Sequence, residues 1–191
     1  MKTKFTENYI CHKNSDGKLR YFFTDGSILE IVSSNKIIFK IVYANGEISY
    51  MDENNDLNQN NGPALATINN EYEFWLNGKK HNNSGPDSIK MNGEVTYHTN
   101  GQLNNFHGPA FFKKNGDMLF YLNGQKHNYY GPAIIKNTGE IVYYRLNQKH
   151  NEEIAAIQDI NDNRRFFIDG EEMEQEAFEA HYNKVIKEKI I

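Results

Sequence analysis

Short apolar runs separated by turn-forming pairs make up most of the chain. Residues 21–23 (Tyr-Phe-Phe) and 37–39 (Ile-Ile-Phe) are two such runs. Pairs such as Asn92-Gly93 and Asn115-Gly116 lie between later runs and predict two-residue hairpin turns, because a type I′ turn needs positive φ at both positions. The pattern therefore predicts many short strands joined as antiparallel hairpins.

The C-terminal segment has a different period. Its apolar side chains recur at every fourth residue: Phe178, Tyr182, Ile186 and Ile190. This spacing predicts a helix with one apolar stripe over 171–191. Asp169 with Glu172 resembles a capping box at its start. We expect the helix to cap the last hairpin, because an array of repeats needs a cover at its open end.

An internal repeat organises the middle of the chain. Every proline follows a glycine, and the prolines are 23 residues apart: Pro63, Pro86, Pro109 and Pro132. A fixed period of this size indicates a repeat architecture. We predict an all-β fold, an elongated antiparallel β-hairpin repeat with one C-terminal capping α-helix. Residues 1–45 form hairpins that start the sheet, 46–170 form the repeats, and 171–191 form the helix.

Two strings in the repeats resemble a variant of the MORN repeat. Residues 76–81 (Leu-Asn-Gly-Lys-Lys-His) precede Gly85-Pro86, and residues 122–127 (Leu-Asn-Gly-Gln-Lys-His) precede 131–133 (Gly-Pro-Ala). The resemblance covers about two-thirds of the chain and implies a meander sheet that binds other proteins. Such repeats occur in bacterial antitoxin-like proteins and in phage and giant-virus proteins, and the family implies no catalytic residues. Asp87 departs from the pattern, since it replaces the alanine after Gly-Pro.

Strand alternation selects one set of aromatic side chains as candidates for binding. Pairing across Asn115-Gly116 predicts Phe111 opposite Phe120 and Ala110 opposite Tyr121. One column of the repeat then lies on the face away from Phe120, and we call it the ladder: Trp75, His98, Tyr121, Tyr144 and Phe167. Aromatic residues with a polar group are enriched at protein interfaces. The ladder is therefore either a partner-binding surface or a core that the loops and the helix cover.

Lysines follow the second turn of most repeats and give one long edge of the sheet a positive charge, although Gln102-Leu103 take that place in one repeat. The predicted binding residues on this edge are Lys79, Lys80, Lys126 and Lys149. The opposite edge is acidic, with Glu94 and Glu140 among its residues. The charges of the two edges either keep the protein soluble or complement the charges of a partner that lies along the sheet.

Composition narrows the function classes. The 191 residues carry a net charge of −4, which argues against direct nucleic-acid binding and gives no reason to expect attraction to an anionic membrane. Cys11 is the one cysteine, which excludes an intramolecular disulfide and a cysteine-built zinc site, and favours a reducing, cytoplasmic location. The 27 asparagines and 14 glycines agree with a chain rich in turns.

Candidate catalytic and metal-binding residues do not converge. The column His81, His127 and His150 suggests a metal, but repeat-equivalent residues stand roughly 9–10 Å apart, too far to share one ion. We expect each histidine to bond its own loop. Residues 52–56 resemble the start of a calcium loop, yet Leu57 occupies the place of the required glycine. No common enzyme motif is present, so we predict no cofactor, metal or catalytic residue.

These observations predict a non-enzymatic module that binds another protein, with the resemblance suggesting a toxin or defence nuclease that it neutralises. Two alternatives stay open: an enzyme with an unrecognised site near residues 52–61, and a charge mimic that competes with nucleic acid. Exposed end strands can also pair between copies, which leaves a homo-oligomer open.

Overall fold

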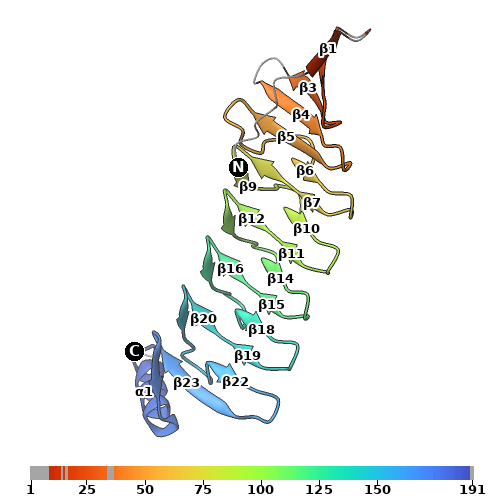
Figure 1. Ribbon diagram of the computed structural model, residues 1–191. Helices are drawn as coiled ribbons and strands as arrows, with labels where there is room; N and C mark the ends of the chain where they lie inside the picture. Colours follow the sequence, from red (N-terminus) through yellow and green to blue (C-terminus); the bar gives the residue numbers. More distant parts are fainter. Residues whose placement is uncertain (1–8, 14, 16, 34–36, 190–191) are drawn as a thin grey trace. The chain divides into compact units, whose positions relative to one another are not determined.

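The computed structural model describes residues 9–13, 15, 17–33 and 37–189. These residues form the predicted all-β fold of antiparallel hairpins, with one helix at the C-terminal end (Figure 1). The chain divides into two compact units, residues 1–101 and residues 102–191.

The first unit is an antiparallel meander in which strands pair in chain order apart from small side hairpins. Its sheet begins with strands of five or six residues: β1 (Tyr9–Lys13), β2 (Leu19–Phe23), β3 (Ile28–Ser33), β4 (Ile38–Val42) and β5 (Ile48–Asp52). It continues with strands of two residues: β6 (Leu65–Ala66), β7 (Tyr72–Glu73), β10 (Ser88–Ile89) and β11 (Val95–Thr96). The remaining strands lie outside this sheet: β8 (Trp75–Leu76) and β9 (Lys79–Lys80), which pair with each other, and β12 (His98–Thr99).

The second unit repeats the same plan and ends in longer strands. Its sheet contains β14 (Phe111–Phe112), β15 (Met118–Leu119), β18 (Ile134–Ile135), β19 (Ile141–Val142), β22 (Ile157–Gln158), β23 (Arg164–Ile168) and β24 (Glu171–Met173). The side strands are β13 (Gln102–Leu103), β16 (Tyr121–Leu122), β17 (Gln125–Lys126), β20 (Tyr144–Arg145) and β21 (Gln148–Lys149), of which β16–β17 and β20–β21 form hairpins.

The helix α1 (Gln175–Lys189) covers β23, as predicted for a cap (Figure 1). Phe178 is 3% exposed, and its ring centroid lies 4.8 Å from that of Phe166 on β23. The helix begins at Gln175 rather than at 171, so the predicted capping box is wrong. Asp169 instead lies in the turn between β23 and β24, and Ile190 of the predicted stripe falls outside the described residues.

Across the described residues, no helix is long and apolar enough to span a membrane.

The first turn of each repeat has three residues rather than the predicted two. In the second unit the Gly116 amide donates to the Lys113 carbonyl, and the Lys113 amide donates to Asp117. Gly116 has φ of +91°, whereas Asn115 is not among the positive-φ residues. This is a type I turn followed by a glycine bulge. The prediction of type I′ turns at these sites is therefore wrong, because only the glycine takes the left-handed conformation.

Type I′ turns close the side hairpins instead. Asn77 and Gly78 have φ of +51° and +71°, and they join β8 to β9 with Trp75 opposite Lys80. Each such turn in the second unit donates an amide to the preceding hairpin, as when the Asn147 amide bonds the Lys126 carbonyl at 3.0 Å. The side hairpins are thus linked to one another by backbone hydrogen bonds.

The extra turn residue shifts the strand register by one. The Cα partner of Phe111 is Leu119, so the predicted pairing of Phe111 with Phe120 is wrong. Because a one-residue shift moves side chains to the other face, the predicted placement of Tyr121 over Ala110 is also wrong. Tyr121 instead belongs to the side hairpin β16–β17, where its Cα partner is Lys126. The innermost positions of the sheet are the fully buried small residues Ala64, Ala110, Ala133 and Ala156.

Candidate partner-binding site

The ladder and the lysine column, predicted as two surfaces, form one surface in the side hairpins. An aromatic residue on the first strand faces a lysine on the second, as in the pairs Trp75–Lys80, Tyr121–Lys126 and Tyr144–Lys149. Cross-strand partners share a face, so the aromatic residue and the lysine lie on the same face of these three hairpins. The hairpin register thus brings together two columns that the sequence analysis treats as separate.

In the second unit the lysines reach from one hairpin to the next aromatic ring. The Lys126 ammonium lies 5.2 Å from the Tyr144 ring centroid, and that of Lys149 lies 4.7 Å from the Phe167 ring centroid. These are cation–π distances. Phe167 is 4% exposed and belongs to the core, whereas Tyr121 and Tyr144 are half-buried. Burial raises the pKa of both tyrosines, so both hydroxyls stay protonated at neutral pH.

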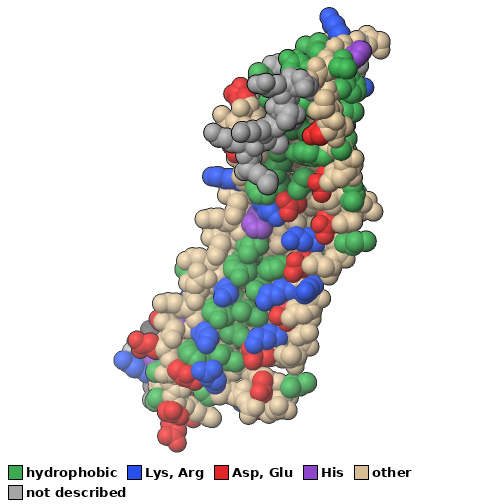
Figure 2. Space-filling model, in the orientation of Figure 1, with side chains coloured by type: hydrophobic (Ala, Val, Ile, Leu, Met, Phe, Trp, Pro, Cys, Tyr) green, Lys and Arg blue, Asp and Glu red, His purple; other side chains and the backbone are tan. Residues whose placement is uncertain are grey.

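The space-filling view shows how side chains of these kinds gather over the second unit. Hydrophobic side chains form a strip along the face in Figure 2, and side chains of both charges lie beside it. A surface of this composition combines apolar contact area with charged groups at its border.

In the first unit a carboxylate holds the ladder residue and its lysine. Glu73 accepts hydrogen bonds from the Trp75 indole and the Lys80 ammonium, both at 2.9 Å. Lys80 also lies 5.5 Å from the Trp75 ring centroid. Lys79 is exposed and packs beside Gly101. Because Glu73 engages both Trp75 and Lys80, the Lys80 charge is balanced within its own repeat.

His98 stands apart from the other ladder residues because it serves a buried carboxylate. Asp87, which replaces the alanine of the other repeats, is fully buried. Its carboxylate lies 2.8 Å from His98 Nδ1 and accepts a 3.0 Å hydrogen bond from the Thr96 hydroxyl. Asp87 and His98 both depart from the repeat pattern, and they compensate each other because a buried carboxylate needs hydrogen-bond partners. His98 is a structural residue rather than a free binding residue.

The histidine column bonds the turn of the next repeat rather than its own loop, which corrects our expectation. His81 Nδ1 accepts a hydrogen bond from the Asn100 amide, and His150 Nδ1 accepts one from the Asp169 amide. Among the described residues no cluster of ligands could hold a metal ion.

His127 is the exception in this column. Both ring nitrogens are buried, and neither makes a hydrogen bond of good geometry to a described residue. Burial is the main reason that the pKa of His127 is lowered; the Tyr144 backbone opposes the shift and Arg145 adds to it. The ring is therefore neutral at pH 7 and packs edge-on against Tyr129, with centroids 4.3 Å apart.

The loops before each Gly-Pro present side chains that the repeat columns did not reveal. Three of these loops are fixed by an asparagine: Asn128 donates to the Pro132 carbonyl and accepts from the Tyr130 amide, and Asn82 and Asn105 make the same pair of bonds. The two residues after that asparagine form the loop tip, and they vary between repeats: Asn83-Ser84, Phe106-His107 and Tyr129-Tyr130. In the last repeat Glu152-Glu153 follow Asn151, but no Gly-Pro comes after them. Phe106, Tyr129 and Tyr130 are 72%, 69% and 97% exposed.

A groove of about 580 Å³ joins the loop tips to the ladder within the second unit. Tyr129 and Tyr130 line it together with the ladder residue Tyr144 and with His127. Ile154, which is 48% exposed, comes from the next loop. The signal for this site in the sequence is that the tip residues vary while the rest of the loop is constant. Repeated columns contain only positions that do not vary, so they do not include the tips.

A comparison with models of known protein families finds no match for the chain, and a search of curated proteins finds none either. The MORN resemblance therefore stays a prediction that rests on the residues of the repeat.

Proposed function

We propose that the protein works by binding another protein, and that the interface centres on the groove of the second unit. One observation carries this proposal: two exposed tyrosines on a loop fixed by Asn128 line the same groove as the ladder residue Tyr144. Tyrosine supplies large contact area with few rotatable bonds, which is why it is common in binding loops. Exposed apolar patches of this kind mark interaction sites.

The charges near the groove support a partner with an acidic group beside its apolar or aromatic anchor. Lys126 and Lys149 lie in the adjoining side hairpins and are complementary to such a group, whereas Arg145, Glu152 and Glu153 line the groove itself. The repeat resemblance suggests that the partner is an enzyme, such as a toxin or a defence nuclease, which the protein neutralises. The regular array supports binding rather than catalysis, because it spreads similar side chains evenly instead of converging different ones on a point.

The test is co-purification from the source cell, followed by measurement of the affinity for the partner that mass spectrometry identifies. Tyr130→Ala should weaken binding by at least about 2 kcal/mol, roughly thirtyfold in Kd, if the tip is an anchor. The matched control is Tyr72→Ala, which removes an exposed tyrosine from a sheet strand of the first unit. An affinity that Tyr130→Ala leaves unchanged would contradict the proposal.

A second variant tests the charge complementarity. Replacing Lys126 and Lys149 by Ser should slow association and make its rate less sensitive to salt, because rim charges act mainly on the encounter. The association rate over a salt series measures this. An association rate that changes neither with the substitutions nor with the salt concentration would mean that the lysines only pack against the aromatic rings.

A further inference from the structure

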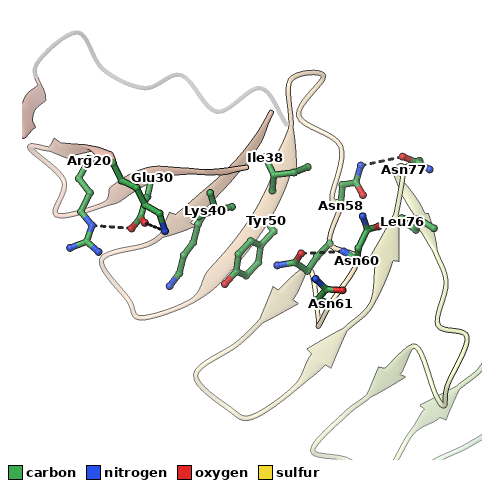
Figure 3. Close-up of a pocket in the computed structure, with 13 residues that line it drawn as sticks. Arg20, Glu30, Ile38, Lys40, Tyr50, Asn58, Asn60, Asn61, Leu76 and Asn77 are labelled. Atoms are coloured by element: carbon green, nitrogen blue, oxygen red, sulfur yellow. Dashed lines mark hydrogen bonds and ion pairs between the residues drawn. The ribbon is translucent and has the colours of Figure 1, made fainter. Parts of the chain in front are cut away.

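A second cavity, unrelated to the groove, lies on the first unit between the long strands and the loop that follows β5 (Figure 3). Its volume is about 770 Å³. One wall is a row of side chains across neighbouring strands, because Arg20, Glu30, Lys40 and Tyr50 are successive Cα partners on β2 to β5. The register therefore places two cations, a carboxylate and a phenol side by side.

The charges of this wall are unbalanced. Among the described residues of the lining, Glu30 is the one carboxylate, and Arg20 and Lys18 both use it, at 2.9 Å and 3.5 Å. Lys40 is half-buried and makes no ion pair with any residue that the structure describes. The described lining thus contains three cations and one anion, and the cation left over is Lys40, whose Cα partner is Tyr50.

The other wall is built from amide side chains in a fixed loop. The Asn58 backbone N–H donates to the Tyr50 carbonyl at 2.9 Å, and the Gln59 backbone N–H donates to the Trp75 carbonyl at 3.0 Å. The Asn58 side chain is buried and bonds Asn77. These bonds hold residues 58–59 against the sheet, while Asn60 and Asn61 are exposed on the edge of the opening (Figure 3).

We propose that this cavity binds an oxyanion, a phosphate or carboxylate group, at the Lys40 ammonium, with the amide groups of Asn60 and Asn61 in the opposite wall of the cavity. An ammonium group and neutral donors are the groups that bind oxyanions, and a charged acceptor strengthens each hydrogen bond. The surplus of positive charge disfavours a cation at the same place. The oxyanion can belong to a free metabolite or to an acidic segment of a protein, and both present the same chemistry to Lys40.

Isothermal titration calorimetry of the full chain tests this site. The free-ligand probes are inorganic phosphate and glucose 6-phosphate, with glucose as the uncharged control, and the protein-like probe is a short polyglutamate peptide. We expect one of the charged probes to bind, glucose to give no signal, and binding to weaken as salt rises. Binding of the phosphates assigns a free ligand, and binding of the peptide alone assigns an acidic protein segment. Failure of all charged probes at about 10 mM would overturn the proposal.

Substitutions connect any binding to the cavity. Lys40→Met should weaken it about tenfold or more, because a charge-assisted hydrogen bond is lost, and Lys40→Arg should retain most of it. Lys114→Met removes the same charge from an exposed turn of the second unit and should have no effect. Asn61→Asp changes only an exposed side chain, so it keeps the test valid if Lys40→Met does not fold, and it should weaken binding by repulsion. Equal affinity in wild type, Lys40→Met and Asn61→Asp would overturn the proposal.

Discussion

The pairing of Asp87 with His98 makes a quantitative prediction about coupled substitutions. His98→Tyr restores the aromatic residue found at this position in other repeats, yet it removes the partner 2.8 Å from a fully buried carboxylate. Breaking a buried pair by removing one member costs about 3–5 kcal/mol. Asp87→Ala leaves a His98 side chain that is 16% accessible and reaches water, so we expect a smaller loss of about 1–3 kcal/mol.

The double variant separates the two contributions. Asp87→Ala with His98→Tyr gives this repeat the alanine and the aromatic residue of its neighbours, and an apolar replacement of a buried pair is often neutral or stabilising. We therefore expect a stability near wild type and a coupling energy of about 4 kcal/mol or more in magnitude.

Urea unfolding of the four proteins measures this cycle. Trp75 is the one tryptophan and lies in the same unit, so its fluorescence reports on the unit that contains the pair. Single losses that simply add, to within about 0.5 kcal/mol, would refute the compensation between Asp87 and His98.

Three other features give predictions. Phe178→Ala should cost about 3–5 kcal/mol in the free energy of unfolding, because the helix loses its buried contact with β23, and an unchanged melting curve would mean that α1 does not cap the sheet. His127→Phe should raise the free energy of unfolding by about 1 kcal/mol, because the two buried ring nitrogens make no hydrogen bond to a described residue. The free energy of unfolding should also fall less steeply as pH drops through the unfolded-state histidine pKa near 6.5, since the lowered pKa of His127 makes the native state bind fewer protons than the unfolded state. Urea midpoints between about pH 5 and 8 measure this. Gly78→Ala should lower the melting temperature more than Gly93→Ala does. Both glycines have positive φ, but only at Gly78 does an added Cβ lie 3.0 Å from the Asp56 side chain. Equal decreases in melting temperature would mean that the turn at Gly78 relaxes.

The sequence predicted the hairpin repeat because a fixed period constrains every strand at once. The prediction of turn type failed because Asn-Gly occurs in two kinds of turn. A type I′ turn needs positive φ at the Asn, whereas a type I turn followed by a glycine bulge does not. Thr138, which occupies the Asn position of one first turn, carried the missing signal, since a β-branched residue disfavours positive φ. A three-residue turn at that position shifts the predicted strand register by one residue and places Tyr121 in the side hairpin.

The candidate sites were predictable to different degrees. The aromatic and lysine columns were visible in the sequence because they repeat, whereas the loop tips escaped because they do not. The cavity beside Lys40 depends on a row across four strands and on a loop held by backbone bonds. Neither the row nor the loop follows from the period of the repeat, because both lie largely before the first Gly-Pro.

The loop construction explains how one fold can carry different binding surfaces. The bonds that fix each loop come from the asparagine before the tip and from the backbone carbonyl of the proline that follows, so the tip side chains do not hold the loop together. Substitution of a tip therefore changes little of the packing that sets stability, since exposed side chains usually contribute within about 0.5 kcal/mol. The same loop frame presents Asn83-Ser84 in one repeat, Phe106-His107 in the next and Tyr129-Tyr130 in a third. The chemistry of the tip can thus vary between these repeats while the Asn and Gly-Pro frame keeps each tip in place.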